Sequence, residues 1–464
     1  MRCLGRVSAQ ARRLQESAFC ELPFMFGDLV KLNDEAFATF RHRIFTLSRT
    51  FWLFLYQVFS AQGSCAEIVS KALLHLMIEH GEIASTSTSG YCQARKRLPQ
   101  ELIDQVERSV AERLENESRC ELWRGRVVKV VDGSSVSMPD TSENRAAFPA
   151  PYSHCPAATF PVMRLVCLFS LASGALVRCE HGPLSDHERT LWRRLWDSLV
   201  AGDVVLADRG FCAFADFALL AGRGVDCVMR LHQKRTVGVE ELERLGRGDC
   251  LVHWLKTKKS LRPDWLSEEQ WAALPERLAV RHVSFQVKVA GFRTQAVTVA
   301  TTLLDPKLYP ARDFAELYRR RWMAELYLRD IKVSLGMDPL RCKTPDMIVK
   351  ELTMHLIAYN LVRALMFRSA LEHKVDPDGL SFKQSLATVR QWTPAMEEAE
   401  GPKRHLALLE LLYFYLASTI VPLRPGRSEP RAKKRRPKNY QLLTKPRHLF
   451  REIYHRNRYQ KCLS

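Results

Sequence analysis

The segment VVKVVDG at residues 127–133 is where the sequence changes from a helix-forming to a sheet-forming character. Its β-branched residues are typical of a buried strand, and the Asp-Gly pair indicates the end of that strand. Strand-like runs follow at 163–171 and 175–179, and a Ser-Gly turn separates them. We therefore expect an α/β domain that opens with three consecutive strands.

After these strands the sequence alternates between helix and strand. Helical patterns cover 185–199 and 213–221, and short apolar runs at 203–207 and 225–230 predict two more strands. The order βββαβαβ indicates a mixed sheet with covering helices. Residues 233–305 then show strand-like alternation around turn-rich segments, which predicts a β-rich insertion.

Composition divides the rest of the chain. The first 120 residues have a helical periodicity, helix returns near residue 311, and the sequence beyond residue 423 is strongly basic. We predict a helical domain at 1–122, the sheet domain in two parts at 123–232 and 306–395, the insertion at 233–305, and a helical and then basic region at 396–464.

Positive charge is the outlier of the composition. The 464 residues carry 70 Lys and Arg against 51 Asp and Glu, which gives a net charge of +19. Residues 424–464 hold 14 of the basic residues and two acids, so they supply +12 of that charge. Such a surplus predicts a polyanionic partner, either nucleic acid or an acidic membrane surface.

Two apolar runs bear on the membrane alternative. Residues 51–59 are too few to cross a bilayer, and residues 406–423 contain Glu410. We expect both runs to be buried helices and no membrane partner. The 13 cysteines include no Cys-x-x-Cys pair, and the first residues lack the apolar core of a signal peptide, which together favour a cytoplasmic location.

A polar turn at 85–89 precedes a short basic helix that ends at a proline. This helix carries Arg95, Lys96 and Arg97, and the arrangement is compatible with a helix pair that docks on DNA. The alternative is a solvated helix whose basic residues interact with the negative end of its dipole. Both interpretations stay open at this point.

The helix predicted near 311–335 carries a polar stripe. Tyr318, Arg321, Glu325 and Lys332 fall within a sector of roughly 60° when each residue turns the helix by about 100°. A stripe of this kind can face a cleft. A weak surface ion pair between Arg321 and Glu325 explains part of the pattern as well.

Two aspartates follow strand-like runs, Asp132 after VV and Asp208 after VVLA. Each has a purely structural interpretation, because Asp-Gly is a common hairpin signal and Asp208 can cap the next helix. Together with Glu325 they make a set of hard oxygen ligands that suits two Mg²⁺ or Mn²⁺ ions. By contrast, Ser185 and Glu188 have the spacing of a capping box, so we expect them to begin a helix.

The spacing Tyr318-x2-Arg321-x3-Glu325-x6-Lys332 resembles the Y-R-E-K signature of bacterial insertion-sequence transposases of the insertion sequence four family, within the DDE superfamily. The segments DGSS at 132–135 and ADRGF at 207–211 are similar to the two aspartate motifs of that family. The resemblance covers about 130–340. It implies an RNase H-like catalytic domain with a β-rich insertion.

The resemblance also implies roles for individual residues. Asp132, Asp208 and Glu325 would be catalytic and bind the two metal ions, while Tyr318, Arg321 and Lys332 would contact phosphates of the transposon end. Arg209, beside a proposed ligand, either touches phosphate or neutralises carboxylates. In such relatives an aromatic side chain of the insertion can hold a flipped base. Phe285 and Phe292 are the candidates here, whereas Trp254, Trp265 and Trp271 lie farther from the Tyr318 helix in sequence.

The function that the resemblance implies is a Mg²⁺-dependent transposase. It would bind the terminal inverted repeats of its element, cleave them, and join 3′-hydroxyl ends to target DNA. Its partners would be double-stranded DNA and a second copy of the chain in a synaptic dimer, in a bacterial cytoplasm at the nucleoid. Two alternatives remain: an inactive DNA-binding regulator or remnant, and a nuclease without strand transfer.

Overall fold

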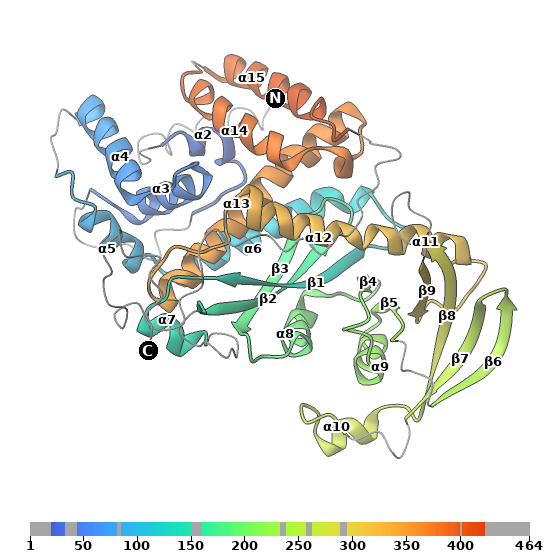
Figure 1. Ribbon diagram of the computed structural model, residues 1–464. Helices are drawn as coiled ribbons and strands as arrows, with labels where there is room; N and C mark the ends of the chain where they lie inside the picture. Colours follow the sequence, from blue (N-terminus) through green and yellow to red (C-terminus); the bar gives the residue numbers. More distant parts are fainter. Residues whose placement is uncertain are drawn as a thin grey trace, which may run out of the picture.

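The computed structural model describes residues 20–32, 44–80, 85–149, 159–232, 238–256, 262–287, 295–399 and 401–422. Within these residues the centre is a nine-stranded sheet in the order β3-β2-β1-β4-β5-β9-β8-β7-β6 (Figure 1). The strands are β1 (Val128–Ser137), β2 (Val162–Ser170), β3 (Leu176–Pro183), β4 (Val204–Ala207), β5 (Asp226–Arg230), β6 (Val239–Gly246), β7 (Asp249–Leu255), β8 (Arg277–Val287) and β9 (Gln295–Thr301).

The first five strands follow the predicted order βββαβαβ except that the short helix α7 lies between β1 and β2. β1, β2 and β3 form an antiparallel meander, and β4 and β5 run parallel to β1. The helices of this part are α7 (Ser142–Ala147), α8 (Glu188–Arg194), followed by the 3₁₀ turn Leu195–Ser198, and α9 (Phe214–Gly222). The predicted mixed sheet with flanking helices is confirmed.

The strands between 239 and 301 continue the same sheet. β9 pairs antiparallel with β5, and β8, β7 and β6 follow as an antiparallel series, with α10 (Glu268–Ala273) between β7 and β8. Arg281 and Asp249 form a buried bidentate ion pair on β8 and β7, with donor–acceptor distances of 2.7 and 2.6 Å. A paired charge of this kind fixes the register of the two strands.

Helices from both ends of the chain pack together on one side of the sheet (Figure 1). They are α2 (Leu22–Phe26), α3 (Leu47–Phe59), α4 (Cys65–His80), α5 (Ser89–Arg97), α6 (Gln100–Glu117) with the 3₁₀ turn Ser118–Cys120, α13 (Pro345–His373), the 3₁₀ turn Pro377–Gly379, α14 (Phe382–Glu397) and α15 (Gly401–Ala417). Arg368 of α13 makes a bidentate pair with Glu117 of α6 at 2.9 and 2.8 Å. α13 therefore packs against helices of the N-terminal region, namely α6 and α3.

The segment 311–335, predicted as one helix, is helical throughout most of its length, but its pattern of backbone hydrogen bonds changes along the segment. It comprises α11 (Ala311–Arg320), a turn residue at Arg321, α12 (Trp322–Arg329) and the π-helical turn Asp330–Ser334. A π turn inserts an extra residue into the helix and is frequent at functional sites. Lys332 lies in this π turn.

The capping box predicted at Ser185 is wrong. α8 begins at Glu188, and the side chain of His187 accepts the hydrogen bond from the N–H of Arg189 at 3.2 Å. Ser185 lies in the turn that leaves β3, where the N–H of Asp186 donates to the carbonyl of Pro183. The chain is still turning at Ser185, so its side chain is one step too early to cap the helix.

Within the described residues, no helix has both the length and the apolar character that a bilayer crossing requires. The apolar run at 51–59 is buried in α3, as expected. The second run falls mainly in α15, where Leu411, Phe414 and Tyr415 are exposed, so only one face of this helix is buried. The basic run at 424–464 lies outside the described residues.

Candidate active site

Strand register brings Asp132 and Asp208 to the same level of the sheet. The parallel pair β1–β4 matches Val130 with Leu206, and two further residues along each chain lead to the two aspartates. Val130 and Leu206 belong to the core under α12 and α13. Because side chains two residues apart share a face of a strand, Asp132 faces the helix that carries Glu325.

Asp132 is not at the end of its own strand. β1 continues to Ser137 in antiparallel pairing with β2, so the Asp-Gly pair does not form a hairpin. A Cβ at Gly133 would lie 2.4 Å from a carboxylate oxygen of Glu188, on the opposite side of the sheet from Asp132, so a larger residue here would require the Glu188 side chain to shift. The strand that ends at this level is β4.

Asp208 is the first residue after β4. Its carboxylate accepts a hydrogen bond from the N–H of Gly210 at 2.7 Å, which shapes the turn that follows. The next helix, α9, has Ala213 at its N-cap, so Asp208 does not cap it. Arg209 is exposed beside this turn.

Arg321 links two of the three carboxylates. Its guanidinium donates to Oε1 of Glu325 at 2.8 Å and lies 4.0 Å from Oδ2 of Asp132. The Arg321 side chain is 16% exposed, so this is not the isolated surface pair that the spacing also allowed. The helix stripe therefore points at β1.

The charge of Asp132 is held in an unfavourable environment. Burial raises its pKa to about 6, against the lowering effects of Arg321 and of the N–H of Gly133. The negative charges of Glu325 and Asp208 raise this pKa further. The three carboxylates therefore lie within electrostatic reach of one another.

Tyr318 is buried at the other end of the stripe. Burial raises the pKa of its hydroxyl to about 12, and the charges of Arg321 and Arg230 act in the opposite direction. Its ring lies 6.2 Å from that of Phe285, centroid to centroid. Sequence reasoning missed Arg230, although its position at the end of β5, the strand next to β4, is where a parallel sheet presents functional side chains.

Lys332 reaches from the π turn to β1. Its ammonium donates to the carbonyl of Ser135 at 2.6 Å and to Oγ of Ser134 at 3.3 Å. It also pairs with Asp338 at 3.3 Å. Sequence reasoning missed Ser134 and Asp338 as its partners. Ser134 lies two residues after the first aspartate, which is the signal that was available.

The other aromatic residues weighed in the sequence have different positions. Trp254 is fully buried and donates to His282 at 2.9 Å. Trp265 lies 3.7 Å beneath the guanidinium of Arg193. Phe292 is outside the described residues. Of this set, Phe285 is in ring contact with a residue of the polar stripe.

The donor set suits a divalent cation. Asp132, Asp208 and Glu325 offer only carboxylate oxygens, the ligands that Mg²⁺ and Mn²⁺ prefer. Their oxygens do not all lie within 4.8 Å of one another, and Arg321 lies between Asp132 and Glu325. Burial is the main reason that the pKa of Asp132 is raised, and a nearby cation would stabilise its charged form, so these residues fit such an ion.

The DNA contact expected of Arg95 is not compatible with its position. Arg95 is 9% exposed, and its guanidinium lies 4.9 Å from the ring of Phe54 and donates to Gln57 at 3.2 Å. It is a packing residue of the helical region. Lys96 and Arg97 are exposed on the same helix, and their contact with DNA stays a prediction.

Replacing Lys96 and Arg97 together by Ala should weaken DNA binding several-fold and reduce the slope of log K against log salt by about 2, because each phosphate contact contributes about 0.9. Arg95→Ala should instead lower the melting temperature and leave the slope unchanged. Fluorescence anisotropy over a salt series measures the slope. A reduced slope in Arg95→Ala with an unchanged slope in the double variant would reverse this assignment.

Comparison with known proteins gives consistent matches. The family described as Transposase DDE domain matches residues 123–361, which is just over half of the chain. This range contains all three carboxylates and the polar stripe. The basic residues of α5 fall before it.

Over most of its length the chain is similar to the transposase InsG for insertion sequence element IS4 of Escherichia coli (strain K12). The two are 28% identical over 413 residues, which is 88% of this chain and 90% of the relative. Among solved structures, the piggyBac transposase in a synaptic complex with hairpin DNA matches with a TM-score of 0.39 and 9% identity, over 90% of this chain and 88% of that chain.

Proposed function

The chain belongs to the DDE transposases of the IS4 family, and we propose that it cleaves the ends of an insertion sequence and joins their 3′-hydroxyl groups to target DNA at a centre formed by Asp132, Asp208 and Glu325. It is an enzyme that acts on DNA, and its family uses divalent metal ions. We propose the roles of these three residues, the identity of the metal ion, and the steps of cleavage and joining.

The observation that carries the proposal is the convergence of three carboxylates on one face of the sheet. Two come from neighbouring parallel strands at matched register, and the third comes from the helix packed above them. The charges of Glu325 and Asp208 each contribute to the raised pKa of Asp132, although burial is its main cause, and this supports the proposal. Carboxylates that lie close together repel one another, and a bound cation reduces this repulsion.

Each carboxylate is proposed to hold metal. Asp132, Asp208 and Glu325 would bind two Mg²⁺ ions, with Mn²⁺ as a substitute, through oxygen atoms alone. Such ions, when bound, activate a water or a 3′-hydroxyl and stabilise the leaving oxygen of a phosphodiester. The contribution of the chain is to place the carboxylates on or beside rigid elements: Asp132 within β1, Asp208 directly after β4 and Glu325 on α12.

The basic residues of the stripe are proposed to bind the DNA backbone. Arg321 and Lys332 carry fixed positive charges beside the carboxylates, and Arg209 is exposed next to Asp208. Tyr318 supports Arg321, whose guanidinium lies 6.0 Å from its ring. Arg321 is proposed to exchange its carboxylate partners for a phosphate when DNA enters, because a guanidinium binds either group in the same bidentate geometry.

We also propose a division of the chain into domains, based on its membership of the transposase family. We take β1–β5 as the RNase H-like core, with residues 123–232 and 306–395 as its two parts and 233–305 as the insertion. The domain at 1–122 would recognise the inverted repeats, and the basic region within 396–464 would bind DNA or a second subunit. A synaptic dimer working in the bacterial cytoplasm, at the nucleoid, completes the proposal, because two ends must be held together.

The proposal is tested with the purified chain and DNA that carries the ends flanking its gene. A labelled, precleaved end and a target plasmid should give joined products with Mg²⁺ and none with EDTA. Cleavage without joining would point to a nuclease. Binding of the ends without cleavage or joining would point to an inactive regulator, and either result would overturn the proposal.

A further inference from the structure

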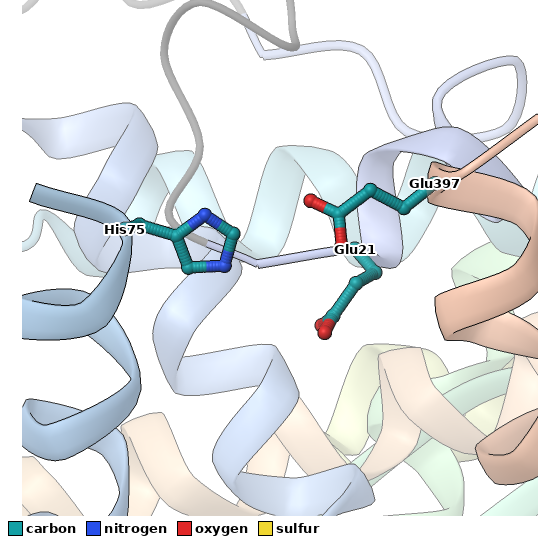
Figure 2. Close-up of side chains that lie close together, drawn as sticks. All are labelled: Glu21, His75 and Glu397. Carbon is teal, nitrogen blue, oxygen red and sulfur yellow. The ribbon is translucent and has the colours of Figure 1, made fainter. Parts of the chain in front are cut away.

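Three potential metal ligands from distant parts of the sequence meet outside the candidate active site. Glu21 directly precedes the short helix α2, His75 lies in α4, and Glu397 is the last residue of α14 (Figure 2). One ligand atom from each lies within 4.8 Å of the other two. No residue of the proposed DNA-cleaving centre belongs to these helices.

Glu21 supplies an observation that is independent of this proximity. It is 6% exposed, and one of its oxygens accepts from the ammonium of Lys71. Its other oxygen, Oε2, is buried and has no hydrogen-bond partner among the described residues. A buried carboxylate oxygen without a partner is costly, and a cation removes that cost.

We propose that Glu21, His75 and Glu397 form a binding site for one Zn²⁺ ion that holds α2, α4 and α14 together. A nitrogen ligand with two carboxylates is a mixed donor set that suits Zn²⁺, whereas Mg²⁺ takes oxygen ligands alone. Zinc–ligand bonds of about 2.0–2.2 Å need the side chains to close by roughly 1 Å, which rotamer changes can supply. Water completes the coordination.

The role of this ion is structural. It joins segments that are more than 300 residues apart in the sequence, on the helices that surround α13. Because binding to the folded state alone stabilises it, the ion should raise the melting temperature. The site thus clamps the helices of the N-terminal region to those of the C-terminal region.

The test uses the full-length chain, stripped with EDTA and then titrated with Zn²⁺ in the presence of excess Mg²⁺, which occupies all-oxygen sites. Bound zinc is measured by mass spectrometry after desalting, and the melting temperature by circular dichroism. Wild type should retain about one Zn²⁺ per chain and melt at least about 2 °C higher with zinc. Co²⁺ in place of Zn²⁺ should give visible d–d absorption.

Two variants and a matched control decide the outcome. Glu397→Gln and His75→Ala should bind Zn²⁺ at least about tenfold more weakly and lose the thermal shift. Glu398→Gln changes the neighbouring, exposed residue and should behave as wild type. Melting curves in EDTA confirm that each variant folds. The proposal fails if zinc binds equally to Glu397→Gln and Glu398→Gln, or if wild type retains no zinc.

Discussion

Asp132→Asn should abolish strand cleavage, with a loss of at least roughly 10³-fold in rate, and leave binding of the transposon ends intact. The loss follows because the negative charge holds a metal ion that supplies several kcal/mol of stabilisation to the transition state. Asn keeps the shape of the side chain and the oxygen that accepts from the N–H of Gly133 at 2.9 Å. Gel assays with labelled end DNA measure cleavage and binding on the same samples.

Asp197→Asn is the control for this experiment. It is the same chemical change at a side chain that is 93% exposed and outside the polar stripe, and it should cleave as wild type does. If Asp132→Asn retained cleavage within tenfold of wild type, Asp132 would not be a catalytic residue. If it lost end binding as well, the substitution would have damaged more than the chemistry.

The sequence predicted the meeting of Asp132 and Asp208 for a partly incorrect reason. The sequence pattern predicts both aspartates at strand ends, but β1 continues for five residues past Asp132. What brings them together is that β4 is short and pairs with only the first part of β1. Apolar runs indicate where strands are, and they do not indicate which neighbour each part of a strand pairs with.

The spacing of residues along the helix predicts one contact of the polar stripe but not its other contacts. Arg321 and Glu325 are four residues apart on a helix, a spacing that places their side chains together. The contact between Lys332 and Ser135 joins residues about 200 positions apart, through a π turn that the sequence pattern does not reveal. Long-range contacts depend on packing that no short motif encodes.

Arg95 shows how a charge run misleads. Three consecutive basic residues resemble a DNA-binding surface, yet a helix turns by about 100° per residue, so they cannot all face the same way. Arg95 lies four residues after Tyr91, which is fully buried, and therefore shares its inward face. The position of Tyr91 in the sequence is the signal that distinguishes the buried Arg95 from the exposed Lys96.

The second large effect expected of Asp132→Asn is on stability. Without metal, the folded protein should become more stable by up to about 3 kcal/mol at pH 7.5, because a carboxyl whose pKa rises from 3.8 to about 6 on folding opposes folding once it is ionised. Between pH 4 and 6 the folded state keeps a proton that the unfolded chain has released, so wild-type stability falls as the pH rises through this window. Asn does not titrate and avoids this loss.

Urea midpoints in EDTA, at pH 4 and at pH 7.5, measure the difference between wild type and Asp132→Asn. The variant should be the more stable at pH 7.5, the gap should close at pH 4, and added Mg²⁺ should narrow it at pH 7.5 by stabilising wild type alone. A gap of the same size at both pH values would show that the buried charge is not its cause. A buried carboxylate lowers the stability of the metal-free protein and also provides the negative charge that binds a cation. The stability cost of Asp132 and its function in the metal-bound enzyme therefore have the same origin.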